Sequence, residues 1–344
     1  MNLRACLLPL LFLPVFLSAC APHSQADCAR SDVYCVGLVT DTGGLLDDGL
    51  TQSAWDGLQQ ALAGGSIQQA DFIESVDSRD YAKNLSTFAE TGYDVIVASG
   101  AGLEDAALQA ADLYPDSVFI GLDQAPDPSR HNFIAVTFPH DRGGFLAGVL
   151  AAHMTDTGIV GAACETSGIS SNWQACEGFR AGVEYADLGV LAYVTYREDG
   201  HREDLFRDEA WGRAAALGMI EDGADVVFGV GGGTGQGALL AAAQAGAWAI
   251  GSERDQFQVR RDAGARILAS VTPDAGPILV QLLSLIPLAQ QPPALALGNL
   301  RLSPYHEAGR FIPLALQDRL AELQAALQEG SISSGVPPEK PKEN

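Results

Sequence analysis

Short, continuous apolar segments alternate with stretches of helical periodicity along most of this chain, and the whole alternation occurs twice. Strands that are apolar at every position are typical of parallel sheets with helices on both faces. Two such sets in 344 residues, more than one core usually organises, predict two similar α/β lobes. The strand-like segments are residues 36–40, 70–76, 93–99 and 118–122, then 133–138, 159–163, 190–196, 226–230 and 248–251, with a last one at 266–271. The helical stretches are residues 50–63, 79–90, 103–113, 144–154, 174–185, 205–220, 237–245 and 278–286.

Residues 1–20 have the form of an export signal. Arg4 precedes an apolar run over residues 5–17, and small residues lead to Cys20. The run is shorter than the roughly 20 residues that span a bilayer, which favours a signal peptide over a membrane helix. Leu-Ser-Ala-Cys at the end also resembles the lipobox of bacterial lipoproteins. We therefore expect residues 1–19 to be a lipoprotein signal peptide, Cys20 to be lipidated and residues 20–32 to be a flexible tether; an ordinary signal peptide cut nearby is the alternative.

The chain has six cysteines, and an exported protein reaches an oxidising compartment. Cys6 leaves with the signal and Cys20 carries the lipid, so an even number remains to form two disulfides. Three pairings are possible, and proximity favours Cys28 with Cys35 and Cys164 with Cys176. A metal site would need clustered Cys and His at short spacings, which neither gap contains.

The charge balance excludes some partners. The chain has 20 Lys and Arg against 43 Asp and Glu, a formal charge of −23, which opposes binding to nucleic acid or anionic lipid. Residues 330–344 contain two adjacent prolines and several charges, so we expect a disordered tail there.

The loop at residues 41–49 is the first candidate for a binding site. It follows the first strand and precedes the first helix, and in parallel sheets ligands bind at the carboxyl ends of the strands. Its glycines allow close approach of the backbone, and a helix start offers free N–H donors. Asp41, Asp47, Leu50 and Thr51 are therefore candidate ligand-binding residues.

Six motifs follow one another between residues 36 and 273. They are VTDTGG with Asp47 (residues 39–47), QSAWDGL (52–58), FLAG (145–148), GFRAGV (178–183), GGTGQG (232–237) and AIG leading to Asp255-Gln256 (249–256). Each is weak alone, but together and in this order they resemble the basic membrane protein family. Characterised members are substrate-binding lipoproteins of ABC importers and bind purine nucleosides.

The resemblance implies a periplasmic-binding-protein fold of type I, with two Rossmann-like lobes joined by three hinge strands. Crossings are expected near residues 138–141, 253–256 and 287–295. The N-terminal lobe would comprise residues 33–138 and 256–287, and the C-terminal lobe residues 139–255 and 295–329. It also implies a lipid-anchored, extracytoplasmic monomer that closes on a nucleoside and docks on an ABC permease, with no cofactor, no metal and no catalysis.

Family contacts carry over where residues match. Asp123 matches an acidic residue that faces the base, and Asp255 matches an aspartate that binds the ribose hydroxyls. The loop lining the cleft beside the sugar matches Gly232, Gly233 and Thr234, and Gly100 follows another strand that ends at the cleft.

The chain departs from the family at the stacking positions. Leu50 replaces a phenylalanine that stacks on the base, and Thr51 replaces the neighbouring asparagine. The second-lobe aromatic is also missing, at Ala175. Trp173 is close enough to substitute for it, or else packs on a Cys164–Cys176 bridge.

Three other functions compete. A receptor lipoprotein that senses ligand without transport would have the same sequence features. Asp41, Thr42, Asp47 and Asp48 resemble the metal motif of nucleoside hydrolases, but that motif has an aspartate where this chain has Gly43. A Gly-rich sequence from Gly233 resembles a dinucleotide fingerprint, although such a fingerprint normally opens its domain.

Overall fold

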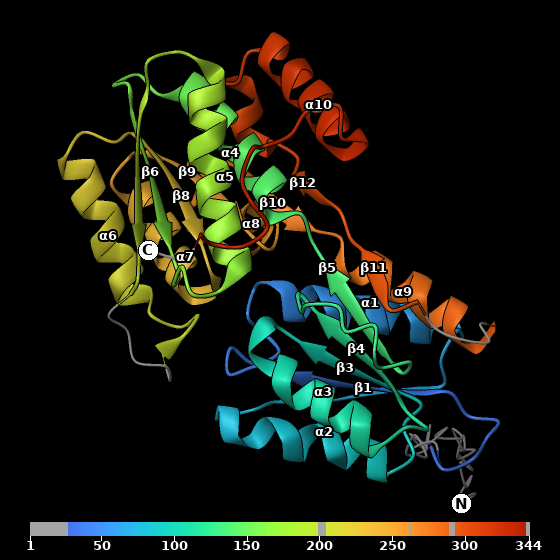
Figure 1. The fold of residues 1–344 in the computed structure, drawn as a ribbon. Helices are drawn as coiled ribbons and strands as arrows, with labels where there is room; N and C mark the ends of the chain where they lie inside the picture. Colours follow the sequence, from blue (N-terminus) through green and yellow to red (C-terminus); the bar gives the residue numbers. More distant parts are fainter. Residues whose placement is uncertain (1–26, 199–203, 262, 289–292, 342–344) are drawn as a thin grey trace, which may run out of the picture.

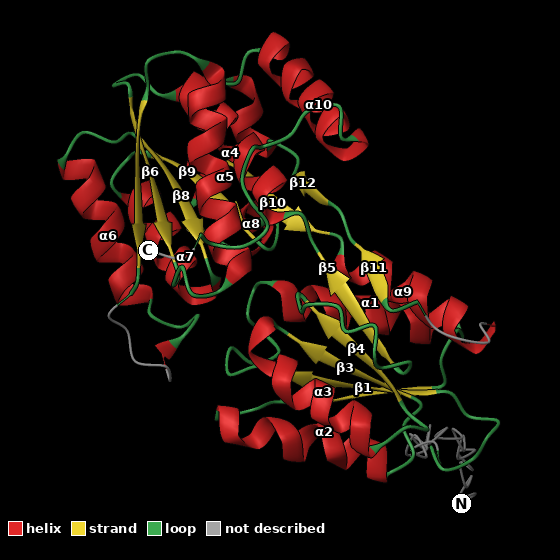
Figure 2. Ribbon diagram, in the orientation of Figure 1, coloured by secondary structure: helices red, strands yellow, loops and turns green. Residues whose placement is uncertain are grey.

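The computed structural model describes residues 27–198, 204–261, 263–288 and 293–341, and these form two α/β lobes (Figure 1). Each lobe is built on one sheet that has helices on both faces (Figure 2). The segment expected to be a signal peptide, Cys20 and the part of the expected tether up to residue 26 lie outside the described residues.

The first lobe contains a sheet of order β11-β5-β4-β3-β1-β2, in which every neighbouring pair is parallel. Its strands are β1 (Cys35–Thr40), β2 (Gln69–Ile73), β3 (Val95–Ser99), β4 (Val118–Leu122), β5 (Phe133–Thr137) and β11 (Leu295–Leu297). Its helices are α1 (Leu50–Ala63), α2 (Tyr81–Glu90), α3 (Glu104–Leu113) and α9 (Ala275–Leu285). Helices α1 and α9 cover one face and α2 and α3 the other (Figure 1), so the continuous apolar strands are buried on both sides.

The second lobe contains a sheet of order β12-β10-β9-β8-β6-β7, parallel except for β12 against β10. Its strands are β6 (Ile159–Cys164), β7 (Leu191–Tyr196), β8 (Val226–Val230), β9 (Trp248–Ser252), β10 (Ile267–Pro273) and β12 (Leu300–Leu302). Its helices are α4 (His140–Met154), α5 (Ser170–Ala186), α6 (Glu209–Glu221), α7 (Gly232–Gln244), α8 (Gln256–Val259) and α10 (Leu314–Glu329).

Two of the glycine motifs serve packing between α4 and α5. A Cβ on Gly148 of FLAG would lie 2.1 Å from the carbonyl oxygen of Phe179, and one on Gly182 of GFRAGV would lie 2.0 Å from that of Phe145. The two helix backbones therefore touch, which only glycine permits at these positions. FLAG and GFRAGV therefore pack α4 against α5, and neither motif lines the cavity between the lobes.

The lobe boundaries differ from the expected ones. The first crossing lies after β5, near residue 138 as expected. The second follows Pro273 instead of residues 253–256, because β10 pairs in parallel with β9 and keeps residues 256–273 in the second lobe. The third lies between β11 and β12, near Gly298, because β11 joins β5 of the first lobe. Hydrophobic periodicity identifies a strand but does not say which sheet edge it joins.

The C-terminal segment also differs from the disordered tail expected from its composition. Its described part, residues 330–341, runs along the second lobe without helix or strand. Gln174 donates to the Pro338 carbonyl, Lys340 Nζ lies 2.7 Å from Ser167 Oγ, and Ser334 is buried against Asp141. Specific polar contacts hold this segment even though its composition predicted disorder.

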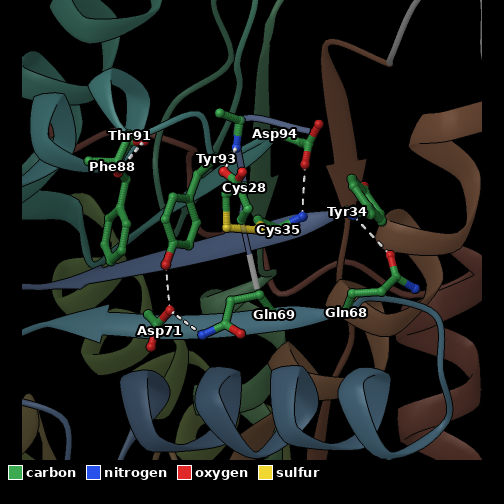
Figure 3. Close-up of a disulfide and its surroundings, with 12 residues drawn as sticks. Cys28, Tyr34, Cys35, Gln68, Gln69, Asp71, Phe88, Thr91, Tyr93 and Asp94 are labelled. Carbon is green, nitrogen blue, oxygen red and sulfur yellow. Dashed lines mark hydrogen bonds between the residues drawn. A yellow bond between two sulfur atoms is a disulfide. The ribbon is translucent and has the colours of Figure 1, made fainter. Parts of the chain in front are cut away.

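The structure joins Cys28 to Cys35 and Cys164 to Cys176, the pairing that proximity favours. The first disulfide joins the segment before β1 to the first residue of that strand (Figure 3). Around it, Asp94 accepts from the Cys35 amide at 2.7 Å and the Tyr93 hydroxyl donates to Asp71. This end of the first sheet is the amino end of β1, opposite the end that faces the second lobe.

Candidate ligand-binding cleft

A cavity of about 300 Å³ lies between the two lobes and is lined by residues from both. Its walls include the loops that follow β1, β3 and β4 in the first lobe and the segments that follow β6, β7, β8 and β9 in the second. Ligands of parallel sheets bind at these carboxyl ends, and the volume suits a small molecule.

Asp47 organises the loop before α1. Its carboxylate accepts from the amides of Gly49, Thr51 and Gln52 at 2.8, 3.0 and 3.1 Å. Gly49 itself has no side chain to cap the helix, so Asp47 satisfies the first-turn donors in its place. The Asp47 carboxylate thereby fixes the conformation of the loop in which Asp48 and Leu50 line the cavity.

Two further carboxylates, Asp41 and Glu253, line the cavity from opposite lobes. Asp41 follows β1 and accepts from the Gly43 amide at 2.8 Å, and Glu253 follows β9 and accepts from the Gly232 amide at 2.9 Å. Burial raises the pKa of each to about 7, and the charge of Asp47 adds to the rise in both. The cleft therefore holds carboxylates that exchange protons near neutral pH.

Asp123, which follows β4, forms an ion pair across the lobes with His140 at the start of α4. Oδ1 of Asp123 lies 2.7 Å from Nε2 of His140, and the Ser171 hydroxyl also bonds this carboxylate. Burial alone would raise the pKa of Asp123, but His140 and Ser171 bring it below its ordinary value. Burial likewise opposes a charged imidazole, but Asp123 raises the pKa of His140.

Phe206 is an aromatic side chain in the cleft that comes from the loop between β7 and α6. The fully buried Glu165 accepts from the Phe206 amide at 2.9 Å, from Thr234 Oγ1 at 2.8 Å and from Arg197 Nε at 2.7 Å. The Gly233 amide donates to the Phe206 carbonyl at 2.7 Å. A buried ion pair thus anchors the segment that carries this ring.

Left-handed backbone conformations gather around the cavity. Asp48, Asp123, Phe206 and Glu253 have φ values of 50°, 59°, 63° and 70°, and all four line the cleft. Such a conformation costs roughly 1–2 kcal/mol for a residue with a Cβ. Strain of this kind persists where the surroundings enforce it and is concentrated at functional sites.

The two lobes are in direct contact beside the cavity. Gln236 of α7 donates to the Asp47 carbonyl at 2.8 Å, and Gln256 of α8 donates to the Asp48 carbonyl at 3.1 Å. Arg254 forms an ion pair with Asp56 of α1 at 2.8 Å. We call these three contacts the clasp; they join the two lobes directly.

Most of the residues proposed from the sequence meet in this cleft. The cavity is lined by Asp41, Asp47, Leu50, Thr51, Gly100, Asp123, Gly232 and Gly233. Thr51 is only 2% exposed, and its hydroxyl lies 3.1 Å from the Ser99 hydroxyl, so the first-lobe core already engages it.

Asp255 does not line the cavity, contrary to expectation. Its Oδ2 lies 2.7 Å from Nε2 of His306 and also accepts from Gln258 at 3.0 Å. The left-handed turn at Glu253 directs that residue into the cleft and leaves Asp255, two positions later, facing the segment before α10. Glu253 lines the cavity instead, and the sequence analysis did not name it. Its position directly after a strand, as for Asp41 and Asp123, is the signal that could have identified it.

Trp173 and Thr234 also lie outside the cavity lining. Trp173 is buried, whereas Ser171, Asn172 and Ala175 present the cleft-facing side of α5. Residue 173 is one step of about 100° beyond 172, which turns it off that side. Thr234 is fully buried, and its hydroxyl donates to Glu165 at 2.8 Å.

In the described ranges, no group of three or more His, Cys, Asp or Glu residues is arranged to hold a metal ion. A search of the same ranges finds no helix with the length and hydropathy needed to cross a bilayer.

Comparison with known proteins gives a consistent result. A family described as "ABC transporter substrate-binding protein PnrA-like" (Bmp) matches residues 35–284. The chain is 31% identical to the CD4+ T-cell-stimulating antigen of Listeria innocua, over 71% of this chain and 70% of that one. It is 27% identical to the ABC transporter nucleoside-binding protein BmpA of Lactococcus lactis, over 70% of each, and 28% identical to basic membrane protein A of Borreliella burgdorferi, over 78% and 76%.

Solved structures show the same fold. An ABC transporter solute-binding protein from Conexibacter woesei superimposes with a TM-score of 0.68 at 21% identity, over 88% of this chain and 98% of that one. One from Aeropyrum pernix gives 0.69 at 20% identity over 87% of each. The fold class predicted from the sequence, a two-lobed binding protein of type I, is confirmed.

Proposed function

The chain belongs to the Bmp family of PnrA-like ABC transporter substrate-binding proteins, and we propose that it captures a purine nucleoside between its lobes and delivers it to an ABC permease. The family consists of solute-binding proteins rather than enzymes, so nothing chemical happens to the ligand. The name of the Lactococcus lactis relative, a nucleoside-binding protein, supports this ligand class.

The observation that carries the proposal is the pair of carboxylates, Asp41 and Glu253, that enter one cavity from opposite lobes. Ionised carboxylates only accept hydrogen bonds, so they suit a ligand that brings several hydroxyl donors together. The vicinal hydroxyls of a ribose are such donors. A ribose bound by both carboxylates would also join the lobes.

The base would lie between Leu50 of the first lobe and Phe206 of the second. Both line the cavity, and Phe206 supplies an aromatic face although Ala175 stands at the family's usual position. Stacking of a base on an aromatic ring is worth about 1–3 kcal/mol in nucleic-acid complexes. The clasp would favour closure around the ligand, whose binding energy is realised in the closed state.

The protein would act outside the cytoplasmic membrane. The signal-like residues 1–19 and the lipobox-like Cys20 support a lipid-anchored, monomeric binding protein held by a short tether. The Cys28–Cys35 disulfide would fix the point where the tether meets the first lobe.

A thermal-unfolding screen tests the proposal. Protein beginning at Ala21 is unfolded and refolded with its disulfides intact, which removes co-purified ligand, and is then mixed with inosine, guanosine, adenosine, uridine, free bases or ribose. A ligand at 100 times its Kd adds about 2.7 kcal/mol to the free energy of unfolding. We expect purine nucleosides to stabilise the protein and to be recovered unchanged. A cooperatively folded sample that responds to no nucleoside would disprove nucleoside capture.

A further inference from the structure

Asn172 places an unpaired amide at the wall of the cleft. It lies in the first turn of α5, lines the cavity and is only 4% exposed. Its Nδ2 atom is buried and has no acceptor among the described residues. A buried amide donor without a partner is unfavourable, and most such groups in proteins are hydrogen-bonded. Its position on the cavity wall makes a ligand atom the natural partner.

The surroundings of Asn172 are rich in donors, which defines what that ligand atom must be. No side chain caps the start of α5, and the first-turn amides of a helix have no acceptor within the helix. The neighbouring Ser171 hydroxyl is already bonded to Asp123. The positive end of the dipole of this 17-residue helix also favours a ligand atom with negative partial charge. The ligand group that meets this turn is therefore a hydrogen-bond acceptor.

Ala175 leaves room for that group. It lies three residues after Asn172, on the same side of α5, and also lines the cavity. Its methyl group replaces a larger side chain without filling the space beside the Asn172 amide. The edge of a planar base can therefore approach the helix there.

On the basis of the proposed function, we propose that Asn172 determines base specificity by donating to the carbonyl oxygen at position 6 of an oxopurine. Inosine and guanosine carry this oxygen. Adenosine carries an amino group at the same position, so the N–H groups of Asn172 and of the base would face each other without an acceptor. The two parts of the nucleoside are then bound by different groups. The carboxylates of Asp41 and Glu253, at strand ends, accept from the ribose hydroxyls, and the Asn172 amide on α5 donates to the base carbonyl.

Isothermal titration of the refolded protein with inosine, guanosine and adenosine tests this assignment. We expect the wild type to bind inosine and guanosine at least about tenfold more tightly than adenosine, since an unmatched polar contact costs about that much affinity. Asn172→Asp replaces the amide donor with a carboxylate acceptor of the same shape. It is expected to reverse the order in favour of adenosine, whose amino group donates.

Two further variants separate recognition from structural effects. Asn172→Ala should lower the affinity for inosine and reduce the discrimination to less than about threefold. Gln328→Glu adds the same charge at an exposed site on α10 and should leave the wild-type order unchanged. Reversal by Asn172→Asp alone would support the proposal.

The possible failures are distinguishable. If the wild type binds no nucleoside, nucleoside capture itself is wrong, and this assignment falls with it. If it binds inosine and adenosine equally, or if Asn172→Asp and Asn172→Ala weaken all three nucleosides by the same factor, Asn172 does not read the base although nucleoside capture stands. If Asn172→Asp does not unfold cooperatively, the proposal is judged from the other two results. Tighter binding of inosine than of adenosine by the wild type, with discrimination lost in Asn172→Ala, supports it, and any other combination contradicts it.

Discussion

The amide nitrogen of Gly232 lies 2.9 Å from Oε1 of Glu253 and joins the loop after β8 to the carboxylate after β9. A Cβ on Gly232 would lie 2.8 Å from the Phe206 carbonyl oxygen, and residue 232 has a φ of 55°, so a larger residue there would displace the loop that carries Phe206. The glycine loop thus positions both Glu253 and Phe206, one for the sugar and one for the base of the proposed nucleoside.

Glu253 should matter for ribosides, and Asp255 should not. We expect Glu253→Gln to raise the Kd for inosine about tenfold, the cost of one charge-assisted hydrogen bond, while changing that for hypoxanthine less than about twofold. Asp255→Asn, which alters a side chain paired with His306, should leave both affinities near wild type. Titration calorimetry of both variants checks this. If Asp255→Asn weakens inosine binding more than Glu253→Gln does, Asp255 and not Glu253 contacts the ribose.

Nucleoside affinity should rise with pH through about 7. Asp41 and Glu253 both have a pKa of about 7 in the free protein, and ribose hydroxyls donate to the ionised carboxylates. Binding should therefore release protons, and Kd should fall between pH 6 and pH 8. In the Asp41→Asn, Glu253→Gln double variant, Kd should no longer change between pH 6 and pH 8.

The stability of the ligand-free protein should follow the opposite trend. The pKa values of Asp41 and Glu253 are raised by folding, so protons bound to them stabilise the folded state. This contribution is fully present below the unfolded pKa values of about 4 and is lost as pH rises through about 7. Chemical denaturation of the wild type and the double variant should show a difference in the free energy of unfolding that grows toward pH 8, in favour of the variant. A difference independent of pH would contradict the raised pKa values.

Phe206 should contribute stacking. Phe206→Ala is expected to weaken purine nucleosides by a factor of about 5 to 100, the range for loss of one aromatic stack, and to leave ribose binding unchanged. Phe206→Tyr keeps the ring and serves as the matched control. Equal losses of nucleoside and ribose affinity in Phe206→Ala would indicate a distorted loop instead of a lost stack.

The clasp should bias the lobes toward closure. Arg254 and Gln256 do not line the cavity, so we expect Arg254→Ala and Gln256→Ala to change nucleoside affinity through the open–closed equilibrium. Gln256 also donates to the carbonyl of Ser252 in its own lobe at 3.1 Å, so Arg254→Ala alone should show the same direction of change. We expect the double variant to have a larger radius of gyration in small-angle scattering without ligand and a Kd about two to ten times higher. Saturating ligand should restore the compact form. Arg319→Ala, which removes an exposed pair on α10, is the control.

Much of the architecture was predictable from local pattern. Buried parallel strands are apolar at every position, so the two lobes and most of their strands could be identified from residues alone. The same reasoning led to Asp41, because a polar residue directly after a parallel strand lies at the edge where ligands bind. Asp123 was proposed from the family resemblance. Short spacing favoured the pairing of Cys28 with Cys35.

Side-chain direction and strand partners depended on contacts between distant residues. Glu253 and Asp255 are two positions apart, and the left-handed turn held by Gly232 decides which of them faces the cleft. Asn172 and Trp173 are adjacent, and the packing of α5 on α4 decides which reaches the cavity. β10 belongs to the second lobe because it pairs with β9. A sequence pattern records burial and periodicity, whereas rotation about a helix axis, the turn after a strand and the choice of sheet edge are set by long-range packing, so only the tertiary structure decided them.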